Sequence, residues 1–528
     1  MALLCAAWLG VVGCTLDNRI VALADGGEAG GESVGDGDGD GDGDGEGGSE
    51  GGPTFNYDLG VPDGPMGFTE ARIPVTCEEA AAYPGSTGCA FIALDLDQSG
   101  LSDHDPWGVA IGNPHPEQLV EVQAEARSGG SWIPLGPPVT IDPEDGILVE
   151  LPDESLLGPG LFGDGAYRIS SDFPVQVMQL SPLQGGQSFS SGAALLHPIE
   201  SQRSRVHAMG WRTEVGIGES AHLSVVALQD DTAVAIEAPV PTAAGPGVPA
   251  SGFLELQEFS ISEGDVVQLA ALDKPMELDY GFTGATVATP HGEPLAVFSS
   301  HTCAGIPGYQ DGCGHVQEQL SRQLFGKRFV AARHPVRTEL VDDPTLWQIR
   351  AIEDDTQIVF EGGPDVVGLP PSGLITLDRA ESINIWVGGD GPGFEIESDE
   401  PIGVFAYHGT PPEGAGNVGG GASMVQLVPV PEYLNHYVLF APEGWDRTMI
   451  SIVREPDSAV LVDGQEVSND LFEPIADFEI GRLLVQPGVH TVETRRPSQV
   501  IVDGVRQGDG FAYLGGWGSP RPVQTPAG

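Results

Sequence analysis

Short apolar segments with an alternating pattern run through most of the chain, separated by turn-forming residues. Ile402, Val404 and Ala406 are apolar at every second position, the spacing at which one face of a β-strand points into a core. The 528 residues include 76 glycines and 44 prolines, which disfavour long helices and favour many turns. The pattern predicts an all-β protein.

One phrase occurs four times: polar turn residues, a proline, and then alternating apolar residues. It predicts a β-bend, in which a strand enters, the polar residues turn, proline fixes φ without offering a donor, and a buried strand leaves. The four prolines are 120, 107 and 96 residues apart, at Pro174, Pro294, Pro401 and Pro497.

A second phrase precedes three of these bends and consists of a strand, an acidic turn and another strand. It includes Asp230-Asp231, Asp354-Asp355 and Asp457, and it predicts a hairpin in each repeat. Repeats of about 100 residues suit a β-sandwich better than a propeller blade, which needs only four strands. We therefore expect tandem related β-sandwich-like units spanning residues 65–205, 206–332, 333–440 and 441–528.

The first residues form an apolar run too short to span a bilayer, which is typical of a secretory signal. It ends in Val11-Val12-Gly13-Cys14, which resembles a bacterial lipobox, so we expect a signal peptide over residues 1–13 and lipidation of Cys14. No Lys or Arg precedes the run, and an ordinary signal peptide with a chance cysteine is the alternative.

Residues 14–64 read as an acidic, Gly/Asp-rich disordered tether, because residues 25–64 hold twelve acidic side chains and no basic one. From residue 36 to 50 every acid stands at an even number, whereas positions 1 and 12 of an EF-hand loop have opposite parity. We therefore expect a solvated linker and no dedicated calcium loop.

Four cysteines remain in the body, and an even number in an exported chain indicates disulfides. The short intervals favour local pairs, Cys77 with Cys89 and Cys303 with Cys313. Zinc is the alternative for the second pair, since His301 and His315 flank it, although the spacing matches no common zinc pattern.

Charge and motifs narrow the function. With 22 basic and 77 acidic residues the net charge is −55, which repels phosphate backbones and excludes nucleic acid as a partner. The chain has no His-Glu-x-x-His and no Cys-x-x-Cys motif. His301 and His408 end similar strands and are expected to be turn histidines. We expect no catalytic residue, no cofactor and no dedicated metal site, while the acidic turns leave weak calcium binding open.

Several longer phrases resemble the amino-terminal domain of the IgGFc-binding protein family, which occurs in bacteria on myxobacterial-type lipoproteins. The most specific runs from Cys313-Gly-His-Val-Gln-Glu-Gln-Leu320 to Phe325-Gly326-Lys327; others start at Thr76-Cys77, Tyr167 and Gly488. The resemblance covers residues 75–517 and implies a secreted, disulfide-bearing interaction module without catalytic residues. Antibody binding, for which the family is named, does not transfer by resemblance.

The sequence thus predicts a non-catalytic adhesion or binding lipoprotein of the outer membrane or cell surface. The lipid is its expected membrane contact, and an extracellular protein or glycan its expected partner. Loops 183–192, 303–313 and 410–421 differ strongly between units and are the expected contact surface if they share a face. An exported polysaccharide hydrolase and a structural envelope spacer are the alternatives.

Overall fold

Four related groups of strands follow one another along the chain. The computed structural model describes residues 68–69, 72–100, 102–183, 191–213, 219–272, 281–307, 314–337, 343, 345–362, 369–387, 391, 393–411 and 420–522. Within them the groups span 87–196 (unit I), 205–319 (unit II), 326–426 (unit III) and 434–514 (unit IV). The predicted signal peptide and tether lie outside the described residues.

The strands of each unit are as follows. Unit I holds β2 (Thr87–Ala93), β3 (Gly108–Gly112), β4 (Val120–Ser128), β5 (Ser131–Pro134), β6 (Val139–Ile141), β7 (Gly146–Glu150), β8 (Gly160–Phe162), β9 (Tyr167–Ser181) and β10 (Gly192–Leu196). Unit II holds β11 (Arg205–His207), β12 (Ala221–Ala227), β13 (Thr232–Glu237), β14 (Leu256–Ile261), β15 (Val266–Ala270), β16 (Thr286–Ala288), β17 (Leu295–Ala304) and β18 (Gly314–Gln319).

Units III and IV continue the series. Unit III holds β19 (Gly326–Ala332), β20 (Thr345–Ala351), β21 (Thr356–Glu361), β22 (Leu374–Leu377), β23 (Ser382–Val387), β24 (Gly393–His408) and β25 (Ser423–Gln426). Unit IV holds β26 (Leu434–Ala441), β27 (Arg447–Arg454), β28 (Val460–Val462), β29 (Gln465–Glu466), β30 (Phe472–Ile475), β31 (Phe478–Val485), β32 (Gly488–Arg506) and β33 (Asp509–Leu514).

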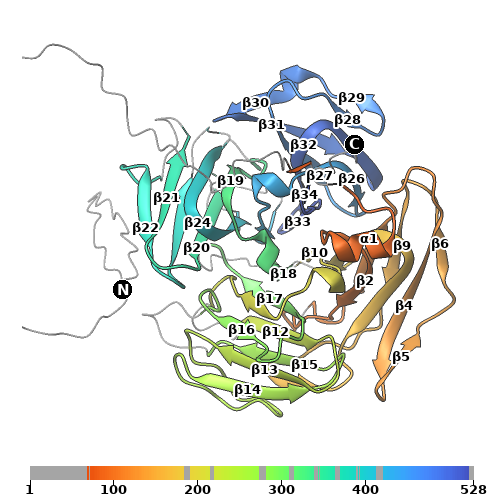
Figure 1. The fold of residues 1–528 in the computed structure, drawn as a ribbon, viewed down its shortest axis with the longest axis vertical. Coiled ribbons are helices and arrows are strands. Elements are labelled where there is room, and N and C mark those ends of the chain that lie inside the picture. Colours follow the sequence, from red (N-terminus) through yellow and green to blue (C-terminus); the bar gives the residue numbers. More distant parts are fainter. Residues whose placement is uncertain are drawn as a thin grey trace, which may run out of the picture. The chain divides into compact units, whose positions relative to one another are not determined.

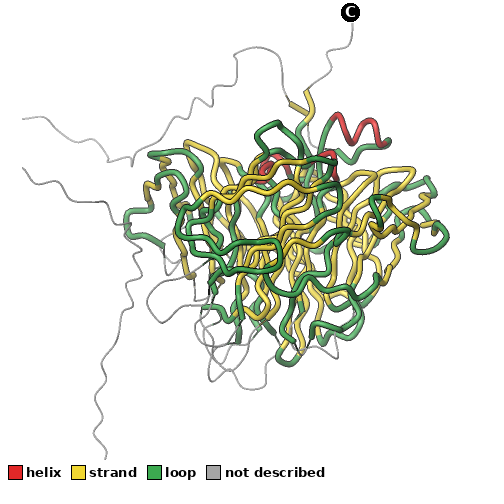
Figure 2. Tube along the Cα trace, turned by 90° about the horizontal axis from the view of Figure 1, so that it is seen from below, coloured by secondary structure: helices red, strands yellow, loops and turns green. Residues whose placement is uncertain are grey.

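Helices are few and short among the described residues. The α-helix α1 (Cys77–Ala82) precedes unit I, and Figure 2 shows it in red beside the strands of the body. Three 3₁₀ turns connect successive units and a fourth lies inside unit IV, namely η1 (Ile199–Ser201), η2 (Arg322–Leu324), η3 (Val430–Glu432) and η4 (Asn469–Leu471). None of the described helices has the length and apolar character needed to cross a membrane.

In units I, III and IV a long strand crosses two antiparallel sheets. The sheet that holds the last strand of the unit (β10, β25 or β33) is called the inner sheet, and the other the outer sheet. β24 pairs with β19 and β21 in its first half and with β20 and β25 in its second half. β9 and β32 change partners in the same way, and in unit II the role is divided between β16 and β17. The four aligned prolines lie at or beside this change, where a residue without an N–H costs no ladder bond.

The hairpins predicted around the acidic turns are wrong. β12 pairs with β15 and β17, whereas β13 pairs with β14 and β16, so the turn at Asp231 connects the inner sheet to the outer one. The same crossing occurs at Asp355 and Asp457, and all three residues have left-handed backbones with φ of 56–58°. Alternation identified the strands correctly, but it carries no information on which strands pair.

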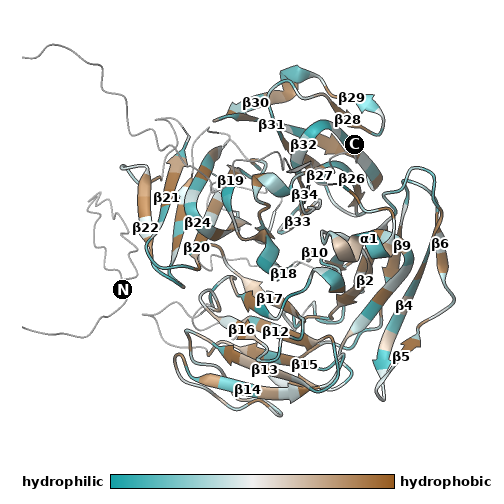
Figure 3. Cartoon of the chain, in the orientation of Figure 1, coloured by the Kyte–Doolittle hydropathy of each residue, from teal (hydrophilic) through white to brown (hydrophobic). Residues whose placement is uncertain are grey.

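The two sheets of a unit enclose a shared core, as expected for sandwich-like units. In unit II, Val225 of the inner sheet and Val234 of the outer sheet belong to one buried cluster. Figure 3 shows apolar and polar residues alternating along many of the strands. The all-β prediction is confirmed.

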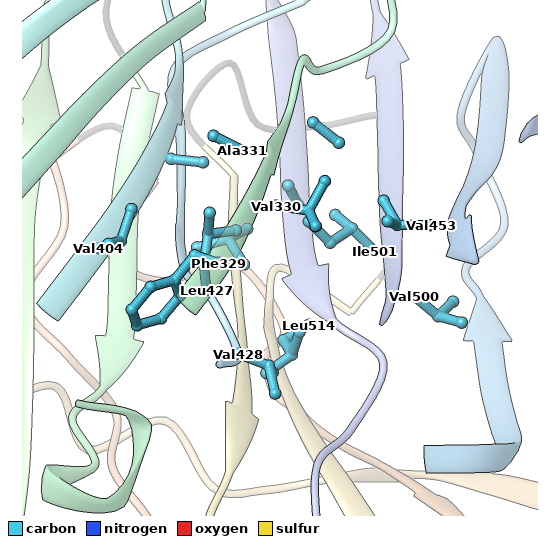
Figure 4. Packing of buried hydrophobic residues seen from close by; sticks show 14 of the residues in the cluster. Phe329, Val330, Ala331, Val404, Leu427, Val428, Val453, Val500, Ile501 and Leu514 are labelled. Carbon is cyan, nitrogen blue, oxygen red and sulfur yellow. The ribbon is translucent and has the colours of Figure 1, made fainter. Parts of the chain in front are cut away.

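The inner sheets are buried on both faces, because each also packs against a neighbouring unit. Val226 and Phe298 of unit II lie in the core of unit I, and Phe405 of unit III lies in the core of unit II. Units III and IV also pack together, and Figure 4 shows Val330 of β19 near Ile501 of β32. Burial on both faces explains why inner strands are continuous apolar runs.

The four last strands of the units close into a ring. β10 contacts β18 and β33, and β25 contacts the same two strands, so the contacts return to their start (Figure 1). Two further links join the units: β8 of unit I extends the inner sheet of unit II, and β1 (Phe68–Thr69) pairs with β34 (Arg521–Pro522). The sequence had suggested sandwich-like units but not their closure around a common centre.

Candidate functional site at the hairpin end of the ring

Four inner hairpins turn at the same end of the ring, which we call the hairpin end. The last paired residues of these hairpins are Ser181 with Gly192, Ala304 with Gly314, His408 with Ser423, and Arg506 with Asp509. Because β10, β18, β25 and β33 touch in a closed cycle, these strand ends meet. The loops that join the two strands of each hairpin therefore start from one small area.

Glycine allows the backbones to meet at this end. A Cβ atom on Gly314 would lie 2.7 Å from the backbone N and O of Ala422, beside β25. One on Gly421 would lie 3.0 Å from the backbone N of Gly510 in β33. Any larger residue at Gly314 would have to push neighbouring units apart.

A buried carboxylate joins units I and IV here. The Ser191 hydroxyl donates to Asp509 Oδ2 over 2.6 Å, and the Ser191 amide donates to Oδ1 over 2.9 Å. Burial raises the pKa of Asp509 to about 6, against the opposing effect of these hydrogen bonds. The carboxylate therefore titrates well above a solvent-exposed aspartate.

Two histidines and two further aspartates link units III and IV. His334 Nδ1 lies 2.6 Å from Asp503 Oδ1, and the His334 ring stacks on His408 with centroids 5.0 Å apart. His408 Nε2 is 3.6 Å from Asp343 Oδ2, which also accepts from the Arg337 backbone amide and from its Nε. All five side chains are buried.

Burial and neighbouring groups determine which side chains of this network are charged. Burial lowers the pKa of His408 to about 4, and the Arg337 charge acts in the same direction. Although burial alone would raise it, hydrogen bonds from His408 and Arg337 hold the pKa of Asp343 far below its usual value. At neutral pH the geometry therefore describes an ionic Arg337–Asp343 pair beside an uncharged His408.

Next to this network lies a small cavity lined by His334, Ser451, Gln499 and Asp503, among others, with about 10 Å³ of free volume. That is room for roughly one water molecule. Within the described part of the chain, His334 Nε2 and Ser451 Oγ have no hydrogen-bond partner, and both line this cavity. The cavity can hold one water molecule between His334 and Ser451.

His334, His408 and Asp503 bring donor atoms within 4.8 Å of one another, but their geometry does not suit a metal ion. The imidazole planes differ by 2° in a stacked arrangement, and nitrogen lone pairs lie in the ring plane, so two stacked rings do not aim at one ion. His334 Nδ1 is also occupied by Asp503. Nothing in the local sequence indicated this cluster, because its members lie on β24, on β32 and in the segment after β19.

The predicted disulfide between Cys77 and Cys89 is confirmed. Its Cα atoms are 5.6 Å apart, and it fastens α1 to β2. Cys303 is disulfide-bonded as well, so its sulfur is not a zinc thiolate. Cys313 and the predicted lipidation site Cys14 lie outside the described residues.

The two histidines that flank the second cysteine pair are both buried. His301 Nδ1 accepts from the Cys303 amide over 3.1 Å, and the His315 ring contacts the His301 carbonyl over 3.1 Å. Burial lowers the pKa of His301 to about 3 and that of His315 to about 4, so both are neutral.

Three loops were expected to form a contact surface. Most of their residues lie outside the described part of the chain, namely 184–190, 308–313 and 412–419.

Aspartate side chains of the acidic turns accept hydrogen bonds from backbone amides. Asp230 Oδ1 accepts from the Glu263 amide over 3.2 Å, and Asp354 Oδ1 accepts from the Arg379 amide over 3.1 Å. Both bonds connect the inter-sheet turn to a neighbouring turn, which is the usual structural use of aspartate in such positions.

The chain matches a known protein family. Residues 192–504, from the start of β10 into β32, match the family model described as IgGFc binding protein. The chain belongs to this family. The match includes units II and III and nearly all of unit IV, whereas the sequence resemblance had been expected to extend over unit I as well. No curated protein matches the chain.

Proposed function

We propose that this chain is a lipid-anchored extracellular binding protein without catalytic activity. What carries the proposal is the closed ring: its described histidines and carboxylates at the hairpin end are buried, and its outer strands present the exposed side chains that a partner can reach. Family membership and the Cys77–Cys89 disulfide support an extracellular interaction module.

The charge favours certain partners. A net charge of −55 repels anionic polysaccharide and anionic lipid, so a neutral glycan or a protein with a basic face is the favoured ligand. The lipid on Cys14 is then the only membrane contact required, and the acidic tether holds the body away from the bilayer. The proposed location is the cell surface.

Ligand binding is tested with the full chain immobilised and exposed to extracellular protein and polysaccharide fractions, at low and at high salt. We expect saturable binding that weakens as salt rises, since exposed charges contribute to association. Release of reducing sugar ends from the same polysaccharides would contradict the proposal and favour the hydrolase. Absence of binding together with a weakened envelope in a deletion strain would favour a structural spacer.

The anchor has its own test, labelling of growing cells with radioactive palmitate. Cys14→Ala should abolish labelling, and Cys5→Ala, a matched change within the same leader, should preserve it. Equal labelling of wild type and Cys14→Ala would refute lipidation at that residue.

A further inference from the structure

A second cluster of metal-ligating side chains lies outside the hairpin end, where unit I meets unit IV. It consists of Glu144, His436 and Glu493, whose donor atoms all lie within 4.8 Å of one another. His436 Nε2 is 3.9 Å from Glu144 Oε1. The cluster therefore draws its members from two units that are far apart in the sequence.

The backbone brings these residues together before any ion is considered. His436 in β26 and Glu493 in β32 are direct partners across the ladder, so their side chains start from neighbouring positions on one face. Glu144 sits in the turn between β6 and β7 with a left-handed φ of 54°, and its amide donates to the His115 carbonyl over 3.2 Å.

The turn that carries Glu144 is held against unit IV. A Cβ atom on Gly146 would lie 3.1 Å from Val489 of β32, and one on Gly112 would lie 3.0 Å from Val438 of β26. This close packing fixes the distance between the turn and the β26–β32 pair.

His436 presents a free nitrogen to the two carboxylates. Its Nε2 is shielded from solvent and has no hydrogen-bond partner among the described residues.

No arginine or lysine competes for these carboxylates among the ion pairs of the described residues. Glu144 pairs with His436 alone, and Glu493 appears in no ion pair there. In a chain of net charge −55, two carboxylates held beside an imidazole without a basic partner form a local cation-binding field.

We propose that Glu144, His436 and Glu493 bind one zinc-class divalent ion that links unit I to unit IV. One imidazole nitrogen and two carboxylate oxygens, with water in the fourth position, make a tetrahedral set that zinc accepts. Calcium prefers six or more oxygen ligands, so the imidazole selects against it. This inference goes beyond the proposed binding function and does not depend on it.

Zinc titration of the full chain by calorimetry tests the site. We expect one ion per chain to bind at this site, and Glu493→Gln and His436→Gln each to weaken that binding at least tenfold. Glu466→Gln, at an exposed position of β29 in the same unit, is the matched control and should leave it unchanged. Zinc should also raise the melting temperature of wild type and control but not of the two site variants.

Cobalt gives an independent readout, because a tetrahedral cobalt ion absorbs strongly in the visible range. That absorption should appear in wild type and Glu466→Gln and be absent in His436→Gln. Metal-free melting curves that coincide for all variants would show that each folds. Site variants that bind zinc with wild-type stoichiometry and affinity, or a His436-dependent site that prefers calcium, would overturn the proposal.

Discussion

The buried Trp517 amide donates to the Ser86 hydroxyl over 2.9 Å, although the two residues are 431 positions apart. In return, the Trp517 carbonyl accepts from the Ser86 amide over 2.8 Å and from its hydroxyl over 3.0 Å. These bonds connect the start of β2 to the segment after β33. They therefore fasten the first unit to the last and close the ring.

Replacing Ser86 by Ala should destabilise the whole body. The change leaves the Trp517 amide buried without its acceptor, which costs about 1–3 kcal/mol. Thermal unfolding monitored by circular dichroism should show a lower melting temperature, whereas Ser131→Ala, at an exposed position of β5, should match wild type. Equal melting of Ser86→Ala and wild type would mean that this contact does not secure the closure.

Gly314→Ala should be destabilising because the new methyl group meets the Ala422 backbone. Overpacking of this kind costs about 1–3 kcal/mol, since neither backbone can rotate away as a side chain could. Gly136→Ala is the matched control, because a Cβ atom there meets nothing within 4 Å. We expect denaturant midpoints to fall for Gly314→Ala and to stay near wild type for Gly136→Ala; the reverse order would contradict close packing at the hairpin end.

Asp509 should make stability depend on pH in a defined direction. Its pKa is raised from 3.8 to about 6 in the fold, so below pH 4 the carboxyl is protonated in both states and its burial is cheap. As pH rises through 6, the ionised group must stay buried, and stability on the order of 3 kcal/mol is lost. Asp509→Asn can keep the Ser191 bonds without this cost.

The corresponding measurement is the difference in unfolding free energy between Asp509→Asn and wild type at pH 4 and pH 7. The free energy of unfolding of Asp509→Asn, relative to that of wild type, should increase as pH rises. A difference that stays constant across this range would show that Asp509 ionises normally in the fold.

The neutral histidines of unit II should have the opposite effect at acid pH. Burial lowers the pKa of His222 and of His301 to about 3, from 6.5. Below pH 6.5 these histidines become protonated in the unfolded chain but stay neutral in the fold. Each one therefore lowers the free energy of unfolding by roughly 2 kcal/mol at pH 5 relative to neutral pH. His222→Gln should flatten the loss of stability between pH 7 and 5, and His291→Gln, at an exposed position, should not.

Loss of the Cys77–Cys89 disulfide should weaken the fold near the ring closure. In the chain-entropy picture a crosslink across 12 residues contributes about 3 kcal/mol. The double variant Cys77→Ser with Cys89→Ser should therefore unfold at lower denaturant concentration than wild type under oxidising conditions. Under reducing conditions the difference should shrink, and a persistent gap would indicate that the serines themselves disturb the packing.

Part of this architecture follows directly from local sequence. The alternation at Ile402, Val404 and Ala406 identified a strand with one inward face, and the four prolines marked where the long strands change sheets. The cysteine spacing identified the Cys77–Cys89 pair, because a short loop brings two thiols together whatever surrounds them. Each of these inferences depends on residues that are close along the chain.

The candidate sites depend on residues that are far apart along the chain. His334 meets Asp503 and Glu144 meets His436 only because whole units pack side by side, and no spacing rule relates such positions. The strand partners of the acidic turns were misjudged for the same reason: period two states which face is buried but not which strand lies next to it. The candidate functional residues therefore come together only in the assembled sheets.

The sequence by itself determined an acidic, all-β body of repeated strands and bends, with a local disulfide. Only the tertiary structure decided that the inner sheets have two buried faces and that the fourth unit returns to the first. The physical reason is that burial of a sheet face fixes a local pattern of side chains, whereas the neighbour that covers the face is selected by packing of the complete chain.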